Sequence, residues 1–338
     1  MTGPPPESPA PDARDAHHRP DASTLAVHRR QNRLRLVATL LIATVLYWAA
    51  ACIAAVTIGL VLALRVIVDG GDIPTSGRDL EVLGIGLGAV VVVSAVIGSV
   101  VALVRLPRQR RRLEEQVLAE TGADVVATDA GTAVNADEDH RRVRNILDAL
   151  AIAAAIPPPR FAVVDDPAPN SFAVGTRPAA AIVAVTQGAI DGLARDELEA
   201  VLAYEVSRIG SWDVALSSWT VALTGAAIGA LDDDLSQFVG RLPFRASVRL
   251  RRWALRDTAL DRDRAAVRFT RNPVGLLRAL EAIEADPREV QRVSAATAPL
   301  WLEVPARIEG ANATLADRIA ALRRLAGTGP DPAPEEHR

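Results

Sequence analysis

The stretch LAYEVSRIGSWD, residues 202–213, carries the pattern that decides the fold. In the motif H-E-x-x-H, two histidines four residues apart lie on one face of a helix and bind zinc, and the glutamate between them acts as general base. Here Tyr204 and Arg208 stand at the two histidine positions, while Glu205 keeps the glutamate. The stretch therefore predicts a helix with the spacing of a metal centre but without its imidazole ligands.

The composition of the 338-residue chain narrows the function classes. Hydrophobic residues make up 49% of the chain, and the mean hydropathy of +0.17 favours a membrane protein. The net charge of −3 gives no reason to expect a nucleic acid partner. Cys52 is the single cysteine, and no histidine lies between His140 and His337. A thiolate cluster and an imidazole metal site between those two histidines are therefore excluded.

Two long uncharged runs, Leu36–Leu64 and Val82–Val104, lie in the first third of the chain. Each exceeds the roughly 20 residues that a helix needs to cross a bilayer. Arginines precede the first run and follow the second, which places both ends in the cytoplasm. The alternative is a buried helix pair in a soluble protein, which the length of the first run disfavours. We expect a multi-pass protein of the plasma membrane whose main domain faces the cytoplasm.

The domain boundaries follow from these runs and from the polar, Pro-rich start of the chain. The expected segments are a disordered tail 1–32, a transmembrane helix 33–68, an extracytoplasmic loop 69–80, a transmembrane helix 81–106, a cytosolic domain 107–325 and a disordered tail 326–338. Within the domain, we expect residues 213–231 to form a buried or membrane-associated helix. A third span is the alternative at that position.

The cytosolic domain is expected to be α+β, mainly helical with a small β-sheet. Apolar residues at helical spacing predict a helix over 137–156. Short apolar runs bounded by Pro or Gly predict strands near 160–166, 170–175 and 179–186. A helix from about residue 196 carries the opening stretch, and amphipathic helices follow near 272–283 and 315–326.

Together these segments resemble the HtpX-type membrane zinc peptidases, the family that also includes the CAAX prenyl proteases. The resemblance covers residues 140–325. It is carried by LAIAAAIPPPRFAVVDDPAPNSFAVG, then AAIVAVTQGAIDGLARDELEAVLAYEVSRIGSWD, then DRDRAAVRFTRNPVGLLRALEAIE. It implies a zincin-like peptidase domain preceded by two transmembrane helices.

The resemblance assigns roles to individual positions. In that family, two helix histidines and a glutamate from a second helix bind zinc. These three ligand positions fall here on Tyr204, Arg208 and Ala259. Glu205 keeps the general base position as a vestige, with Asp261 and Asp263 nearby on the second helix. We therefore expect no zinc, no other cofactor and no peptidase activity. The alternative is an active membrane metalloendopeptidase with an unusual ligand set of Glu205, Asp261 and Asp263.

The spacing of Tyr204, Glu205 and Arg208 also predicts what replaces the metal. Residues three and four apart on a helix are neighbours, so the three side chains can meet. Our hypothesis is that the Arg208 guanidinium fills the cationic position and neutralises a buried Glu205. The alternative is a partly solvated pair of little energetic value.

One binding element is expected to persist without the metal. In similar peptidases the substrate lies along an exposed strand edge beside the active helix, and such an edge binds extended peptide through backbone hydrogen bonds. The corresponding residues are Asn170, Ser171, Phe172, Ala181, Ile182 and Val183. The expected partners are the lipid bilayer and a polypeptide substrate or membrane protein.

Overall fold

The computed structural model describes most of the C-terminal two thirds of the chain and the first long helix. The described residues are 22–68, 88, 89, 92, 93, 95, 96, 99, 112–126, 138–229, 259–294, 296–305 and 314–327. The predicted loop 69–80, most of the predicted second span 81–106 and most of the tail 326–338 lie outside them.

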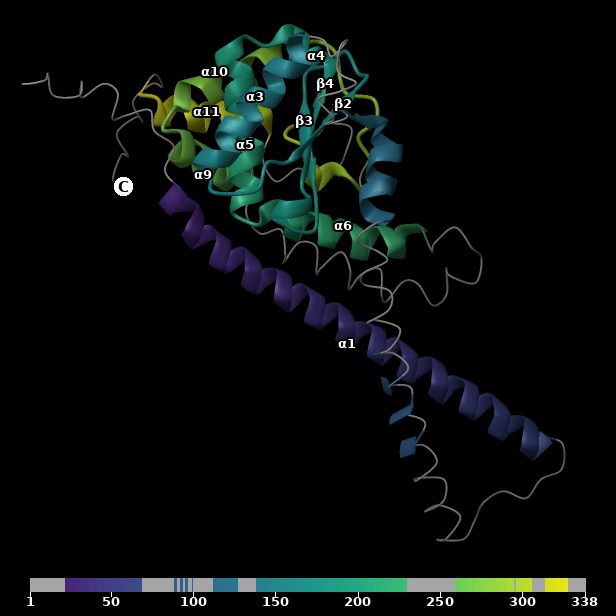
Figure 1. Ribbon diagram of the computed structural model, residues 1–338. Coiled ribbons are helices and arrows are strands. Elements are labelled where there is room, and N and C mark those ends of the chain that lie inside the picture. Colours follow the sequence, from purple (N-terminus) through teal and green to yellow (C-terminus); the bar gives the residue numbers. More distant parts are fainter. Residues whose placement is uncertain are drawn as a thin grey trace, which may run out of the picture.

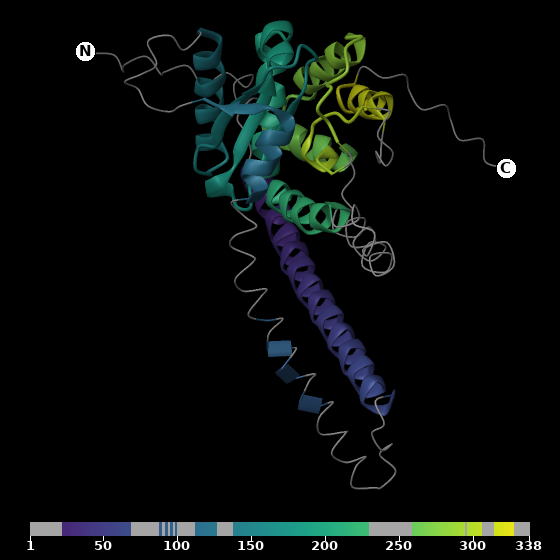
Figure 2. The same cartoon turned by 90° about the vertical axis from the view of Figure 1, so that its right-hand side faces the viewer.

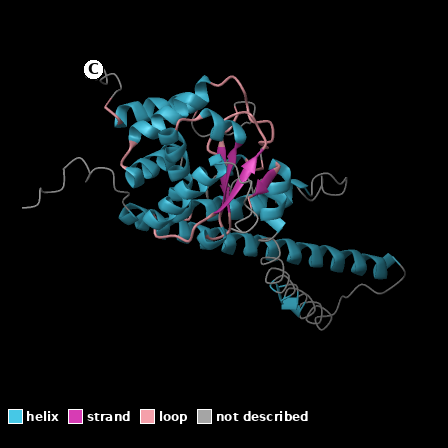
Figure 3. Cartoon of the chain, turned by 45° about the horizontal axis from the view of Figure 1, so that its top comes forward, coloured by secondary structure: helices cyan, strands magenta, loops and turns pink. Residues whose placement is uncertain are grey.

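The elements follow the predicted α+β order. The helices are α1 (Ala22–Val68), α3 (Glu138–Ala153), α4 (Gln187–Gly192), α5 (Arg195–Gly210), α6 (Asp213–Gly229), α9 (Ala259–Thr270), α10 (Pro273–Ala285) and α11 (Leu315–Leu325). The strands are β1 (Ala123–Val125), β2 (Arg160–Val164), β3 (Ser171–Val174) and β4 (Ile182–Thr186). Helices surround the small sheet, as the colouring by secondary structure makes plain (Figure 3).

The four strands are ordered β1-β2-β4-β3. β4 lies inside the sheet, parallel to β2 and antiparallel to β3. Every residue of β4 is buried, as expected for a strand covered on both faces. Alternate residues therefore serve two cores. Val183 and Val185 face the core that includes α3 and α5, whereas Ile182 and Ala184 face a second core that includes Val290, Leu300 and Trp301.

Helix α5 lies at the centre of the helical layer, between α3, α9 and α10 (Figure 1). All its residues from Ala200 to Gly210 are buried, so this part of the helix has no solvent face on which charges could remain hydrated. Any ionised side chain in that stretch must find a partner inside the protein.

Helix α1 begins at Ala22, upstream of the predicted boundary at residue 33, because its first turns are anchored to the domain. Arg29 Nε donates to Gly210 O at 3.0 Å, and Asn32 Nδ2 donates to Ser211 O at 3.0 Å. These two donors satisfy carbonyls at the C-terminal end of α5, which a helix otherwise leaves unpaired. Beyond this anchor α1 leaves the domain and extends far past it (Figures 1 and 2).

Among the residues that the structure describes, no helix meets the length and hydropathy required of a membrane crossing. The predicted pair of transmembrane helices is therefore not confirmed.

Two residues separate the end of α5 from the start of helix α6, and the first part of α6 is buried in the protein. Residues Val214, Leu216 and Trp219 are all under a tenth exposed. Leu216 and Trp219 pack with Leu36 of α1 in a small apolar cluster, and the Ser218 hydroxyl accepts a hydrogen bond from Gly175 N at 3.0 Å. The described start of this helix thus belongs to the interior.

Candidate functional site

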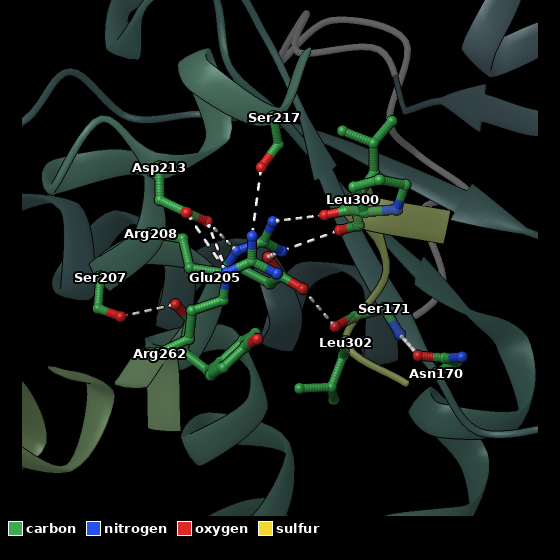
Figure 4. A network of polar contacts seen from close by, with 12 residues as sticks. Asn170, Ser171, Glu205, Ser207, Arg208, Asp213, Ser217, Arg262, Leu300 and Leu302 are labelled. Carbon is green, nitrogen blue, oxygen red and sulfur yellow. Dashed lines mark hydrogen bonds and ion pairs between the residues drawn. The ribbon is translucent and has the colours of Figure 1, made fainter. Parts of the chain in front are cut away.

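Tyr204, Glu205 and Arg208, which we predicted to meet on α5, lie together in the interior of the protein. Figure 4 shows Glu205 and Arg208 within the polar network around them. Glu205 is 0% exposed, and Tyr204 and Arg208 are each 1% exposed. Arg208 Nη1 lies 2.9 Å from Glu205 Oε2. The buried ion pair is what our hypothesis from spacing predicts, and the partly solvated alternative does not describe it.

Arg208 has more partners than the sequence indicated. Its Nε donates to Asp213 Oδ2 at 2.8 Å, and its Nη1 donates to Leu300 O at 2.8 Å in addition to Glu205. Its Nη2 donates to Pro299 O at 3.2 Å. The planar fork of a guanidinium carries five N–H donors, and here it joins α5, the start of α6 and residues 299–300.

Asp213 is shared between two arginines. Arg262 Nε, from α9, lies 3.2 Å from Asp213 Oδ2, beside the bond from Arg208. Burial alone would raise the pKa of Asp213, but the charges of Arg262 and Arg208 outweigh it and lower that pKa. The carboxylates of Glu205 and Asp213 in turn raise the pKa of Arg208, against the effect of its burial. The cluster thus brings two acidic and two arginine side chains together inside the protein.

Glu205 is held on both of its oxygens. Ser171 Oγ, at the start of β3, donates to Oε1 at 2.9 Å, while Arg208 occupies Oε2. Burial raises the pKa of Glu205, and the Arg208 charge and the Ser171 hydrogen bond oppose that rise. A general base directs an oxygen at water, whereas each oxygen of Glu205 has a hydrogen-bond partner within the protein.

Tyr204 lies between two guanidinium groups. The Arg208 Cζ is 5.6 Å and the Arg318 Cζ 5.7 Å from the centroid of its ring, within the range of cation–π attraction. Burial raises the pKa of the Tyr204 hydroxyl. Arg318, from α11, also makes a two-pronged ion pair with Asp263 of α9, with distances of 2.8 and 2.7 Å. Asp263, which the sequence analysis placed near the metal position, therefore belongs to a second buried ion pair, with Arg318.

The remaining predicted positions lie on α9, which packs against α5. Ala259 is the first residue of that helix. Asp261 is about half exposed and forms a surface pair with Arg264 at 3.2 Å. Within the described part of the chain, no three His, Cys, Asp or Glu side chains converge as metal ligands would. The alternative set of Glu205, Asp261 and Asp263 does not come together.

The residues at the family's ligand positions do not fit a zinc ion. A tetrahedral zinc site needs lone pairs from nitrogen, sulfur or oxygen donors at about 2.0 to 2.3 Å. The Arg208 guanidinium has no lone pair to give and stays protonated, and the Ala259 side chain has no donor atom. The cationic position is filled by protein.

The predicted peptide edge needs correction in two respects. Ala181 precedes β4, and Ile182 and Val183 lie on it, an interior strand paired on both sides, so these three residues do not form an edge. The sheet does end at β3, which includes Ser171 and Phe172, with Asn170 immediately before it. However, its outer side is covered by the chain itself, because Phe172 forms an antiparallel bridge with Trp301.

Sequence reasoning missed several members of the site, notably Asp213, Arg318 and the carbonyls of residues 299–302. Arg318 was detectable in principle. It lies on the same face of α11 as Ile319 and Leu322, which are buried, so a charge in an apolar stripe marks a buried pair. Nothing local to the sequence indicates that residues 299–302 contact this site.

Comparison with known proteins gives one consistent result. The family model for peptidase family M48 matches residues 137–331. A protease HtpX homolog of Dictyoglomus turgidum is 30% identical over 230 residues, which cover 60% of this chain and 75% of the relative. The homolog of Dictyoglomus thermophilum is 32% identical over an alignment of the same coverage. That of Lactiplantibacillus plantarum is 28% identical over 281 residues, or 73% of this chain and 92% of the relative.

Proposed function

Because the chain belongs to peptidase family M48, we propose that it is a catalytically inactive member, which binds polypeptides beside a membrane instead of cleaving them. The proposal separates two properties that the family's fold usually combines. The framework around α5 is retained, whereas the groups that would activate water are replaced.

The observation that carries the proposal is the placement of Arg208. Its guanidinium is buried where the second imidazole would stand, and it bonds to Glu205, Asp213 and two carbonyl oxygens. Even a carboxylate whose pKa is raised by burial, as that of Glu205 is, has little driving force to deprotonate water of pKa about 15.7 unless a metal lowers that value. The arrangement supports a structural role for Glu205 in place of a chemical one.

The membrane part of the proposal is supported by the surface of α1. Apolar side chains lie exposed along this helix, among them Leu41 at 62% and Leu60 at 68%. Residues 36–64 carry no charge. Soluble proteins rarely leave so extended an apolar surface uncovered, and lipid would cover it at no cost. Under this proposal the arginines at the start of α1 lie on the cytoplasmic side.

A proteolysis assay on the full-length protein in detergent tests the proposal. We expect no cleavage of unfolded casein above background, with or without added zinc, and no difference between the wild type and Glu205→Gln. A homologous protease that carries an intact H-E-x-x-H motif serves as the positive control. Zinc-dependent cleavage that Glu205→Gln abolishes would show the metalloendopeptidase alternative to be correct.

A further inference from the structure

The short 3₁₀ helix Ala298–Leu300 leads into Trp301–Glu303, which lie along the outer side of β3, the position that an extended peptide would occupy. Trp301 bridges Phe172 in antiparallel orientation, and Leu302 N donates to Ser171 O at 2.8 Å. Asn170 continues the contact, because its side chain donates to Glu303 O at 2.9 Å and accepts from Glu303 N at 3.2 Å. These are the contacts by which strand addition recognises a peptide backbone.

Two buried arginines hold the carbonyls of the same segment. Arg208 donates to Pro299 O and Leu300 O, and Arg318 Nη1 donates to Leu302 O at 2.6 Å. Arg208 therefore contacts the backbone of the 3₁₀ turn Ala298–Leu300, which leads into the residues paired with β3, and Arg318 contacts one of those residues. A zinc centre would contact the carbonyl of a bound peptide in a comparable way.

The segment also supplies side chains to fixed positions. The Trp301 ring lies 4.6 Å, centroid to centroid, from that of Phe172, and both are buried in the core that includes Ile182 and Leu300. Main-chain hydrogen bonds give a strand its affinity for a sheet edge, and side chains in pockets give specificity. Ala298–Glu303 has both kinds of contact.

We propose that Ala298–Glu303 is a resident occupant of the peptide-binding edge, and that it closes this edge to other polypeptides until it is displaced. This inference rests on the proposed function, since it concerns the regulation of the same binding surface. It also specifies the ligand. A competing polypeptide must be extended where it pairs with β3, must present carbonyls to Arg208 and Arg318, and must carry a large aromatic side chain against Phe172.

The test uses a labelled peptide with the sequence of residues 297–304, TAPLWLEV, added to the full-length protein in detergent. Trp301→Ala weakens the resident segment but leaves β3, Arg208 and Arg318 unchanged. We expect this variant to bind the peptide at least tenfold more tightly than the wild type does. Trp48→Ala, the same substitution on α1, is the matched control and should bind as weakly as the wild type.

Two further arms keep the test decisive. Trp301→Leu retains an apolar side chain and should fold even if Trp301→Ala does not, with an affinity for the peptide above that of the wild type. A peptide in which alanine replaces the tryptophan should bind none of the proteins. Equal affinity of the wild type, Trp48→Ala and a folded Trp301 variant would overturn the proposal. The casein assay is independent of this result, so failure of the inference would leave catalytic inactivity untouched.

Discussion

The centre of α5 and the outer part of α1 differ in which kind of side chain they bury. Around Glu205 and Arg208, charged groups are buried and meet partners within the protein. Along α1, apolar groups such as Leu41 and Leu60 are exposed. The charges of the first region have their partners within the protein, whereas these apolar side chains of the second remain exposed among the residues that the structure describes.

The contrast between the buried charges of α5 and the exposed apolar surface of α1 indicates which region can contact other molecules. A buried charge cluster with matched partners stabilises one arrangement and resists the approach of water or metal. An uncovered apolar helix gains free energy only when lipid or another protein covers it. Under the proposed function, activity towards other molecules is therefore expected from surfaces and edges, and not from the buried centre of α5.

Arg208→Ala should break the self-contained centre most severely. The substitution leaves the buried carboxylate of Glu205 without its cation, and breaking a buried pair costs about 3 to 5 kcal/mol. We expect the free energy of unfolding to fall by that amount in denaturant titrations. Asp213 keeps Arg262, so the loss arises mainly at Glu205.

The double variant Arg208→Ala/Glu205→Gln sharpens this point. Removing the stranded charge should recover part of the lost stability, though not all, because the carbonyls of Pro299 and Leu300 still lack a donor. If both the single and the double variant unfold like the wild type, the centre is not held by this pair.

Leu41→Glu probes the other region. A charge in the middle of a membrane-embedded helix costs about 2.5 to 3.5 kcal/mol, so we expect this variant to be depleted from the membrane fraction of cells. The melting temperature of the domain should not change, because Leu41 is exposed. Unchanged membrane recovery of Leu41→Glu would argue against lipid as the covering partner.

The pH dependence of stability should reveal the two acids of the centre with opposite signs. The pKa of Asp213 is lowered in the folded protein. Its contribution is therefore complete above the unfolded value of about 3.9 and is lost as pH falls through the lowered pKa. The pKa of Glu205 is raised, so this group makes stability fall as pH rises from about 4.3 towards that raised value.

Denaturant titrations from pH 2 to pH 7 can separate the two contributions. The stability difference between the wild type and Asp213→Asn should shrink below about pH 4, by about 1.4 kcal/mol for each unit of pKa shift. The Glu205→Gln variant should lack the opposing slope above that pH. Parallel curves for the wild type and Asp213→Asn would mean that Asp213 titrates alike in both states.

Arg264→Ala should have the smallest effect on the free energy of unfolding among these variants. Arg264 pairs with Asp261 at 3.2 Å, but both side chains are about half exposed. Exposed pairs contribute about 0 to 1 kcal/mol, so we expect a loss below about 0.5 kcal/mol by the same denaturant titration. A loss as large as that of Arg208→Ala would remove the distinction between buried and exposed pairs on which the account relies.

Much of the fold could be predicted from the sequence, because local patterns of residues determine these helices and strands. Helical periodicity predicted α3, and Pro and Gly boundaries predicted β2, β3 and β4. The Glu205–Arg208 pair followed from a spacing of three residues on one helix. These features depend only on neighbours in the chain, so periodicity and spacing suffice to find them.

The predictions were wrong where the structure depends on contacts between segments that are far apart in the sequence. The start of α1 at Ala22 depends on carbonyls at Gly210 and Ser211, which no local pattern in the tail reveals. The edge at β3 is closed by Trp301 and Leu302, which lie far downstream. The order of the strands likewise places Val183 in the interior of the sheet. Although β3 lies between β2 and β4 in the sequence, β2 pairs directly with β4, in parallel.

The zinc content of the purified full-length protein tests the central claim most directly, with the triple variant Tyr204→His/Arg208→His/Ala259→Glu as the control that restores the family's ligands. Elemental analysis after dialysis against micromolar zinc should give essentially no zinc per wild-type chain and about one per chain of a folded triple variant. About one zinc per wild-type chain, lost in Glu205→Gln, would contradict the account, because it would place a metal where the structure places the guanidinium of Arg208.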